Sequence, residues 1–359
     1  MSGRWEPAAT TVLTGAGGWF GRAFLDAVAR PRPEHGPVAR EGAVRVLAAT
    51  PAEVPAILEV LPRAVVHVGD VADPRVLDRL LDGAEGASVV HAAGVIHPAA
   101  VADFARVNLE GTREVLAAAT RAGARRLVHV SSNSAFGVNA TPDDRFRQHE
   151  PYRPYLGYGR SKMAAEQLVL ETAASGRLDT VVVRPPWFYG PFQPARQSSF
   201  FTMVAGGRFP VLGDGAQRRS MVFVDNLVQG VALAEHHPDV TGQAFWVADR
   251  EAYAMSDIVA TVARVMREEG YVVSGRVLRA PGLVGRLAER ADRLLQDRGV
   301  YHQSLHVLGE MDKTIACDVS ATVDTLGYRP HVDLAEGMRR SVRWCAAQGI
   351  VLAPRRDAR

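Results

Sequence analysis

The chain has 359 residues, of which 47% are hydrophobic and 23% are charged, which is ordinary for a globular protein with a large core. The formal net charge is only +3 and no dense Lys/Arg run with interleaved aromatic residues occurs, so we expect no nucleic-acid partner. With no apolar stretch of about 18 residues, no apolar signal core in residues 1–10, and two cysteines (Cys317 and Cys345) without metal-ligand spacing, we expect a cytoplasmic protein without a membrane span or metal site.

Short β-branched runs alternate with helical patterns in the first half of the chain, which is typical of a parallel sheet with crossover helices. The expected strands are 11–13, 44–47, 64–68, 88–91, 127–130 and 180–183, and the expected helices are 20–30, 74–81, 101–121 and 158–174. We therefore predict an α/β fold with a Rossmann doubly wound parallel sheet. The dinucleotide-binding domain is expected to span 8–184, with 221–248 returning to it.

The remaining residues, 185–220 and 249–350, are assigned to a smaller C-terminal substrate-binding lobe. Segments 31–42, 139–154 and 185–197 are expected to be irregular, and the last, with four prolines, to link the two lobes. Residues 281–303 predict an amphipathic helix and its flank. Its apolar side is expected to consist of Leu283, Val284, Leu287, Leu294 and Leu295.

A glycine-rich turn follows the first predicted strand directly. Gly15 permits a tight turn, Gly18 lets the backbone approach a pyrophosphate, and Gly21 lets the helix and strand pack closely. The start of the next helix offers unpaired N–H groups to phosphates, so we place Trp19 and Phe20 in the same cofactor site. A turn without a ligand is the alternative, which the position between strand and helix disfavours.

The identity of the dinucleotide stays open at the end of the second predicted strand. An acid at this point binds the ribose 2′-hydroxyl of NAD, but residues 48–51 contain neither an acid nor a well-placed arginine. The cofactor is therefore NAD or NADP, with Thr50 beside it. Asp70 and Val71, after the third predicted strand, are expected to contact the adenine, unless Asp70 caps the next helix.

Tyr158 and Lys162 lie one helical turn apart in the predicted helix 158–174. A tyrosine that takes or returns a hydroxyl proton lets a cofactor move the hydride. A free tyrosine has a pKa of about 10, which Lys162 and a positive nicotinamide ring are expected to lower. Ser132 is expected to hold the substrate oxygen. A mere surface pair of Tyr158 and Lys162 is the alternative.

Over nearly its whole length the chain resembles an extended short-chain dehydrogenase/reductase, of the NAD-dependent epimerase/dehydratase and 3β-hydroxysteroid dehydrogenase-like superfamily. The matching motifs are Thr14 to Gly21, Asp70, His91-Ala92-Ala93-Gly94, Asn108-x-x-Gly111-Thr112, Ser131-Ser132, Gly137, Tyr158 with Lys162, Arg184-Pro185, Tyr189-Gly190-Pro191, Phe223-Val224-Asp225-Asn226 and Leu326-Gly327-Tyr328-Arg329-Pro330.

The resemblance implies a catalytic set of Ser132, Tyr158 and Lys162. It also implies that Asn108 supports the proton relay, with a purely structural role as the alternative, and that the backbone beyond Pro185 contacts the nicotinamide carboxamide. The cofactor is further expected to contact Ala92, Ala93, Gly94, Tyr158 and Lys162. A homodimer through the helix with Tyr158 and the long helix before it is a further implication.

Three positions bear on the reaction. Related dehydratases carry Asp and Glu after the catalytic Ser/Thr, where this chain has Asn133 and Ser134, which disfavours dehydration and decarboxylation. Trp187 stands where sugar-nucleotide enzymes carry Asn; it flanks an apolar or ring-shaped substrate or packs between the lobes. Arg219 suits an anionic substrate group, or forms a surface pair with Arg218. Ser132, Asn133, Ser134, Trp187 and Arg219 are the predicted substrate contacts.

The leading hypothesis is an NAD(P)-dependent oxidoreductase that transfers a hydride at a secondary alcohol or ketone carbon of a small molecule, with Tyr158 as acid and base. The second is a sugar-nucleotide epimerase that oxidises its substrate transiently with bound cofactor, which Arg219 motivates. A dinucleotide sensor without activity is the third, and the presence of Ser132, Tyr158 and Lys162 together disfavours it.

Overall fold

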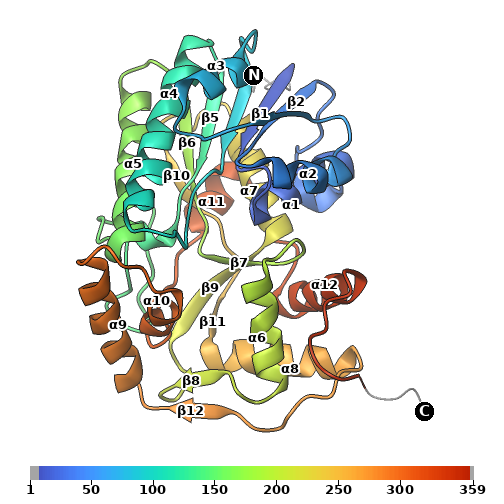
Figure 1. The fold of residues 1–359 in the computed structure, drawn as a ribbon, viewed down its shortest axis with the longest axis vertical. Coiled ribbons are helices and arrows are strands. Elements are labelled where there is room, and N and C mark those ends of the chain that lie inside the picture. The colour runs from blue at the N-terminus through green and yellow to red at the C-terminus, as the bar shows by residue number, and fades with distance from the viewer. Residues whose placement is uncertain (1–7, 356–359) are drawn as a thin grey trace.

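A central parallel sheet forms the upper part of the molecule in Figure 1, a computed structural model that describes residues 8–355. Its strands are β1 (Thr10–Thr14), β2 (Ala43–Ala48), β3 (Val65–Val68), β4 (Ser88–His91), β5 (Arg126–Val130), β6 (Asp179–Arg184) and β10 (Ala244–Trp246). The strand order is β10-β6-β5-β4-β1-β2-β3, and all the pairings are parallel. The predicted doubly wound Rossmann fold is confirmed, with the order reversing between β1 and β4.

Helices cover both faces of this sheet. Helices α1 (Trp19–Ala29), α2 (Val54–Val60) and α7 (Val224–His236) lie on one face, and α3 (Pro74–Leu81), α4 (Gly111–Arg121) and α5 (Leu156–Ala174) on the other (Figure 1). Each face has its own apolar cluster, because the valines of parallel strands alternate between the two layers. The helix predicted over 101–121 is present and continuous from residue 102, with Phe104–Glu110 in π-helical form before α4 begins.

A smaller lobe lies below the carboxyl ends of the strands (Figure 1). Its strands are β7 (Trp187–Tyr189), β8 (Pro210–Leu212), β9 (Arg218–Phe223), β11 (Ala252–Ala254) and β12 (Leu278–Ala280). Its helices are α6 (Ala195–Ala205), α8 (Met255–Glu268), α9 (Leu283–Gln296), α10 (Gln303–Glu310) and α12 (Leu334–Ala347). Helix α11 (Ser320–Leu326) packs back on the sheet domain. Strands β11, β9 and β7 form one sheet, and β12 pairs with β8. None of the helices within residues 8–355 is long and apolar enough to cross a membrane.

The segment 185–197 is more regular than its prolines suggest. Strand β7 occupies its middle and pairs in parallel with β9, and α6 begins at Ala195. The buried ring of Tyr189 contacts Phe223, so tertiary packing supplies the order that the local sequence does not. The irregular structure expected over all of 185–197 is therefore a wrong prediction.

Helix α9 exists as predicted, but its apolar side faces outward. Leu283, Leu287 and Leu294 are 52%, 53% and 56% exposed. The buried side of the helix consists of Gly285, Ala288, Asp292 and Gln296. The small residues allow close packing against α10 and the polar ones are hydrogen-bonded, so the helix is ordered by its polar side.

Candidate functional site

The glycine-rich turn connects β1 to α1 at the carboxyl edge of the sheet and lies against the residues that follow β4. Gly15 has a φ of +76°, and a Cβ there would lie 2.7 Å from the Ala93 nitrogen and 2.8 Å from the Ala92 carbonyl carbon. A Cβ at Gly21 would collide with the Gly15 carbonyl oxygen. Thr14 Oγ1 accepts from the Ala93 N–H at 3.2 Å, which holds the two strand ends together. This edge is where doubly wound sheets bind dinucleotides.

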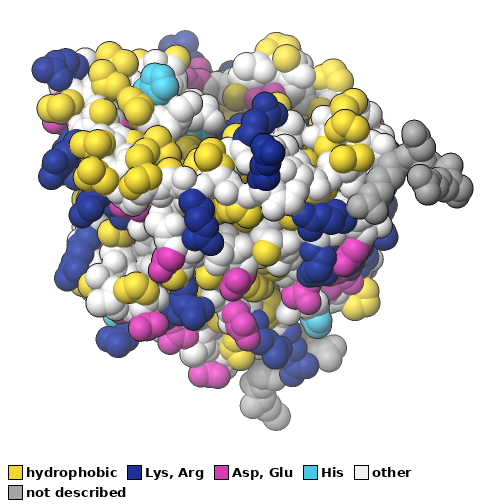
Figure 2. All heavy atoms as spheres, turned by 90° about the horizontal axis from the view of Figure 1, so that it is seen from below, with side chains coloured by type: hydrophobic (Ala, Val, Ile, Leu, Met, Phe, Trp, Pro, Cys, Tyr) yellow, Lys and Arg dark blue, Asp and Glu magenta, His cyan; other side chains and the backbone are white. Residues whose placement is uncertain are grey.

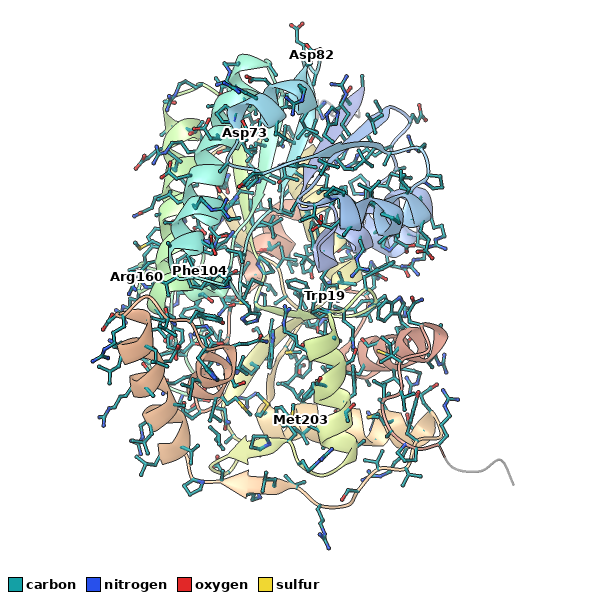
Figure 3. The ribbon with its side chains drawn as sticks, viewed as in Figure 1. Trp19, Asp73, Asp82, Phe104, Arg160 and Met203 are labelled. Atoms are coloured by element: carbon teal, nitrogen blue, oxygen red, sulfur yellow. The ribbon has the colours of Figure 1, made fainter. Side chains whose placement is uncertain are left out.

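Trp19 connects the turn to the smaller lobe. Its Nε1 donates to the Pro191 carbonyl at 2.7 Å, and its ring centroid lies 4.8 Å from that of Phe188. Figure 3 places Trp19 where the two lobes meet. The Phe20 side chain is buried in the core of the sheet domain, so only its backbone is available to a phosphate.

An acid that the sequence analysis missed stands beside this turn. Glu53 Oε2 accepts from the Ala49 N–H at 3.0 Å, and a Cβ on Gly17 would collide with the same carboxylate. The short helical turn Pro51–Glu53 folds the acid back to the end of β2, where an acid can reach a ribose 2′-hydroxyl. The signal was Thr50-Pro51-Ala52-Glu53, which has the spacing of a capping box.

Asp70 is exposed and lies after β3, as expected. Its Oδ1 accepts from the Ala72 N–H at 2.9 Å, and its Oδ2 is paired with the guanidinium of Arg106. The alternative role as helix cap is wrong, because Asp73 caps α3 by accepting from the Arg75 N–H. An adenine contact of Asp70 stays a prediction, and its carboxylate is shared with an arginine.

Thr50 and the segment after β4 lie at the same edge of the sheet. Thr50 is exposed at the start of the turn that carries Glu53. Ala92 and Ala93 are half-buried and Gly94 is exposed, so this segment is partly accessible. Val71 is buried, and a Cβ on Gly111 would lie 2.7 Å from its Cγ1, so Val71 also supports the start of α4. All these positions stay predicted cofactor contacts.

Tyr158, Ser132 and Lys162 come together between β5 and α5. All three side chains are nearly buried, and the Tyr158 ring lies 5.9 Å from the ring of Phe104, which Figure 3 labels. Ser132 caps the short turn Asn133–Ala135, its Oγ accepting from the Ser134 N–H at 3.2 Å. The surface-pair alternative for Tyr158 and Lys162 is wrong, because neither side chain is on the surface.

Burial governs the protonation of this group. It raises the pKa of Tyr158 to about 12, while the Ser132 hydroxyl lowers it, Glu310 raises it and Arg196 lowers it. Burial lowers the pKa of Lys162 to about 8, and Glu166 opposes that change. Among the described residues Lys162 is not a cause of the Tyr158 shift, which differs from our expectation.

The reason lies in the direction of the lysine side chain. Lys162 Nζ donates to the Val130 carbonyl at 2.8 Å and lies 3.5 Å from His129 Nε2. Burial lowers the pKa of His91 to about 3 and that of His129 well below its usual value, with the Lys162 charge adding to both effects. Of Lys162, His91 and His129, only Lys162 is therefore a cation at neutral pH.

Asn108 forms a closed set of hydrogen bonds. Its Oδ1 accepts from the Val95 N–H at 2.8 Å, and its Nδ2 donates to the Val95 carbonyl at 3.0 Å and to Ser161 Oγ at 2.9 Å. The amide thus ties the segment after β4 to α5 between Tyr158 and Lys162. This geometry agrees with the structural alternative, and a part in the proton relay stays a prediction.

The predicted substrate residues fall into two groups. Asn133 and Ser134 adjoin Ser132, and the Asn133 N–H donates to the Pro185 carbonyl at 3.3 Å. Arg219 lies farther into the smaller lobe, with its guanidinium 6.0 Å from the ring centroid of Trp187. Among the described residues, no hydrogen bond connects Arg219 with Ser132.

Arg219 is not a surface residue, so the alternative of a surface pair with Arg218 is wrong. It is 5% exposed and donates to the Glu310 carbonyl, while its Nε has no hydrogen-bond partner among residues 8–355. Trp187 is 38% exposed over it. The buried guanidinium of Arg219 therefore lies next to an accessible indole ring, that of Trp187.

Two charged residues near Tyr158 were missed. Arg196 at the start of α6 lowers the pKa of Tyr158, and Glu310 at the end of α10 raises it. Arg196 lies in the segment predicted to be irregular, and α10 follows the predicted amphipathic helix. No local motif marks either residue, because only the packing of the smaller lobe under the sheet brings them to the tyrosine.

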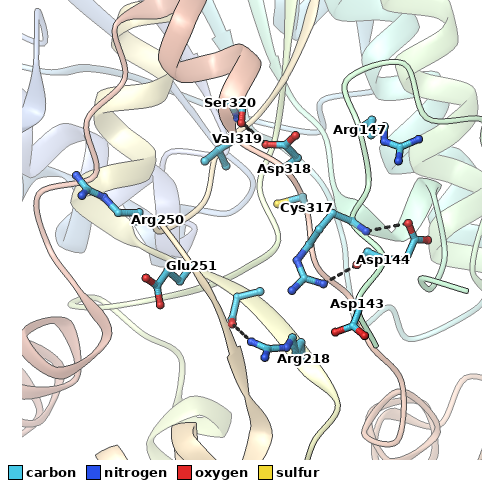
Figure 4. Close-up of a pocket in the computed structure, with 12 residues that line it drawn as sticks. Asp143, Asp144, Arg147, Arg218, Arg250, Glu251, Cys317, Asp318, Val319 and Ser320 are labelled. Carbon is cyan, nitrogen blue, oxygen red and sulfur yellow. Dashed lines mark hydrogen bonds between the residues drawn. The ribbon is translucent and has the colours of Figure 1, made fainter. Parts of the chain in front are cut away.

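A separate polar pocket of about 520 Å³ lies away from these residues. It is lined by Asp143, Asp144, Arg145, Arg147, Arg218, Arg250, Glu251, Ala252, Cys317, Asp318, Val319 and Ser320 (Figure 4). Its four arginines face four acids, so the pocket has no net charge that would select an anion or a cation.

The comparisons with known proteins agree with this geometry. Residues 11–248 match the NAD dependent epimerase/dehydratase family. The chain is 44% identical over 345 residues to the uncharacterized protein y4nL of Sinorhizobium fredii (strain NBRC 101917 / NGR234), covering 95% of this chain and 96% of that protein. It is 32% identical over 244 residues to the 4-hydroxy-2-methyl-3-oxo-4-farnesyl-3,4-dihydroquinoline-1-oxide ketoreductase of Stigmatella aurantiaca, covering 67% and 68%.

A solved structure shows the same fold. The dTDP-glucose 4,6-dehydratase DesIV from Streptomyces venezuelae, with NAD and TYD bound, has a TM-score of 0.73 at 24% identity and covers 94% of this chain and 97% of that one. The family match spans more than half of the chain. The protein belongs to the NAD dependent epimerase/dehydratase family of extended short-chain dehydrogenases/reductases, and is an NAD(P)-dependent enzyme.

Proposed function

We propose that this enzyme is an NAD-dependent oxidoreductase that interconverts a secondary alcohol and a ketone on a small molecule. The observation that supports it is the buried group of Ser132, Tyr158 and Lys162, followed by Asn133 and Ser134 instead of carboxylates. The ketoreductase relative, 32% identical, bears a name of the same reaction class.

The residues divide the work by their chemistry. The nicotinamide ring supplies or accepts the hydride when the cofactor is bound. Tyr158 gives its proton to the developing alkoxide, or takes one in the reverse direction. Ser132 donates a hydrogen bond to the substrate oxygen. Lys162 supplies a buried positive charge one helical turn away, directed toward the Val130 carbonyl and His129 rather than toward the Tyr158 hydroxyl.

The direct test is a stoichiometric assay with purified enzyme and panels of ketones and secondary alcohols. We expect one nicotinamide oxidised or reduced for each substrate molecule converted, seen as a net change in its absorbance. Conversion of a sugar nucleotide into its epimer with no net absorbance change would contradict the proposal.

An epimerase is the second candidate, and one observation favours it. Arg219 Nε is buried without a hydrogen-bond partner among the described residues, so a donor is left for an anionic group of a substrate. An epimerase would copurify with cofactor and turn over without added NAD. Mass spectrometry of small molecules released on denaturation separates the two candidates.

The cofactor we propose is NAD rather than NADP, because of Glu53. Its carboxylate beside Gly17 and Ala49 can accept from a ribose 2′-hydroxyl and repels a 2′-phosphate. We expect Glu53→Gln to lower the preference for NAD by about tenfold or more, since a charged hydrogen bond contributes roughly 1.5–3 kcal/mol. Titration of both cofactors by fluorescence gives the two dissociation constants.

Glu59→Gln is the matched control for this change. Glu59 lies on α2, six residues after Glu53 along the chain, and is exposed. Its substitution removes the same charge without altering the contact with Gly17, so the ratio of the two dissociation constants is expected to stay unchanged. Equal effects of both substitutions would show that Glu53 acts only through overall charge.

Cofactor affinity is expected to depend on pH through Lys162. Burial lowers its pKa from 10.5 to about 8, so the ammonium is present below pH 8 and is lost as the pH rises through that value. The affinity for NADH, which carries negative phosphates, should be constant below about pH 7 and fall above pH 8. Lys162→Gln should bind more weakly at neutral pH and show no inflection near pH 8. An inflection that persists in this variant would assign the titration to another group.

We further propose a homodimer in a reducing compartment, the cytoplasm. Half-buried Val107, Leu168 and Leu170 leave apolar surface on and just before the helices α4 and α5 through which dimerisation is expected. The free thiols Cys317 and Cys345 support the compartment. Light scattering should give twice the mass of the chain.

A further inference from the structure

One end of the smaller lobe exposes a row of large apolar side chains. They come from α9, from β12 and from the residues beside these elements, and each is about 36–56% exposed: Val277, Leu278, Leu283, Val284, Leu287, Leu294 and Val300. Together with the arginines described below we name this region the α9 surface. Single exposed apolar residues are ordinary, whereas several large ones gathered on one helix and its flanking segments mark an interaction site.

The outward direction of these side chains is determined by the opposite side of α9. Asp292 Oδ2 accepts from His306 Nδ1 at 2.8 Å and from Gln296 Nε2 at 3.0 Å. Gln296 Oε1 accepts from the Gly157 N–H at 3.0 Å, at the start of the helix that carries Tyr158. If α9 rotated to bury its leucines, these hydrogen bonds would break. The outward apolar face is therefore a stable feature of the surface.

Rotation is also opposed by close packing. A Cβ on Gly285 would lie 2.7 Å from the Asp312 carboxyl carbon, and one on Gly309 would lie 3.0 Å from the Glu289 Cα. The buried side of α9 thus has no room for a leucine. The helix is amphipathic with its polar, small-residue side inward, which is the reverse of an ordinary surface helix.

The same surface is strongly basic. The exposed arginines of residues 272–300 are Arg276, Arg279, Arg286, Arg290, Arg293 and Arg298. Of the acids in this range, Asp292 is buried, Glu289 is paired with Arg293 and Lys313, and Asp297 is exposed. Figure 2 shows this end from below, with hydrophobic side chains gathered at the upper left and Lys and Arg side chains along the left edge.

We propose that the α9 surface docks on the anionic face of a lipid bilayer. Leu283, Leu287 and Leu294 would enter the boundary of the acyl chains while the arginines contact the headgroups, as in helices that lie in the plane of a membrane. A second copy of the chain fits less well, because a twofold contact would set six arginines against six with few acids between them. Docking of this kind needs no membrane span, and it is independent of the reaction catalysed.

The test is cosedimentation of the full chain with vesicles. We expect binding to mixed phosphatidylglycerol and phosphatidylcholine vesicles, weaker binding to phosphatidylcholine alone, and loss of affinity at high salt. Leu287→Gln with Leu294→Gln should lower the partition coefficient at least tenfold. Arg286→Gln with Arg290→Gln should lower it about fivefold for each arginine removed.

The matched control is Val65→Gln with Val323→Gln, two valines that are 50% and 41% exposed at other places on the molecule. This pair should bind vesicles as the unchanged protein does, and circular dichroism should be the same for all variants. No binding to the anionic vesicles, or equal loss in the leucine and valine variants, would overturn the proposal. The proposal would also be overturned if the protein were a dimer that did not bind vesicles and if the leucine variant were a monomer. The α9 surface would then be a contact between two copies of the chain.

Discussion

Tyr158→Phe is expected to lower turnover by about 10²–10⁴-fold while leaving the affinity for NAD within about twofold. General acid–base catalysis by a positioned side chain contributes roughly this factor. The substitution removes one oxygen and keeps the ring, which packs against Phe104 at 5.9 Å and is buried, so α5 keeps its place. Steady-state rates with the best ketone or alcohol and fluorescence titration of the cofactor measure the two quantities.

Tyr155→Phe is the matched control for this prediction. Tyr155 lies just before α5, three residues from Tyr158, and its hydroxyl is buried without a hydrogen-bond partner among the described residues. Loss of that hydroxyl breaks no bond, so its turnover should stay within about threefold of the unchanged enzyme. Retained turnover in Tyr158→Phe, or equal losses in both variants, would remove Tyr158 from the proton transfer.

The sheet domain could be predicted well because its signals are local. Each strand is a short β-branched run, and α1 and α3 each have an apolar periodicity of their own. The predicted site residues follow these elements directly, so the carboxyl ends of parallel strands bring them to one edge. The helix α2 was missed because Pro51 and Pro55 mark the segment as a turn.

The residues that the sequence did not reveal depend on long-range packing. Glu53 reaches the glycine-rich turn only because a short helical turn folds it back toward Gly17. Arg196 and Glu310 act on Tyr158 from the smaller lobe, more than 30 residues away along the chain in each case. Spacing within one element carries no information about such contacts.

Helix α9 shows a different limit of sequence periodicity. The pattern of Leu283, Leu287 and Leu294 identifies an apolar side, but it does not say what that side contacts. In most surface helices the core supplies the contact. Here the hydrogen bonds of Asp292 and Gln296 hold the polar side of α9 toward the interior. The spacing of apolar residues in a helix does not predict this orientation.

Glu166→Leu is expected to lower the free energy of unfolding by about 3–5 kcal/mol, the usual cost of leaving a buried charge without its partner. Glu166 is fully buried on α5 and accepts from Arg184 Nη2 at 2.6 Å, Ser131 Oγ at 2.5 Å and the Tyr152 hydroxyl at 2.9 Å. The leucine would leave the Arg184 guanidinium buried and unpaired. The shift of the urea midpoint, followed by circular dichroism, measures this loss.

Two further variants separate the ion pair from the helix. Glu171→Leu changes an exposed glutamate on the same helix, so its urea midpoint should hardly move. Glu166→Leu combined with Arg184→Met removes both charges, and should recover part of the lost stability, because an apolar pair of similar volume tolerates burial better than one lone charge. If the double variant were less stable than Glu166→Leu alone, the packing of Arg184 over the Phe136 ring at 4.4 Å, rather than its charge, would be what stabilises this end of β6.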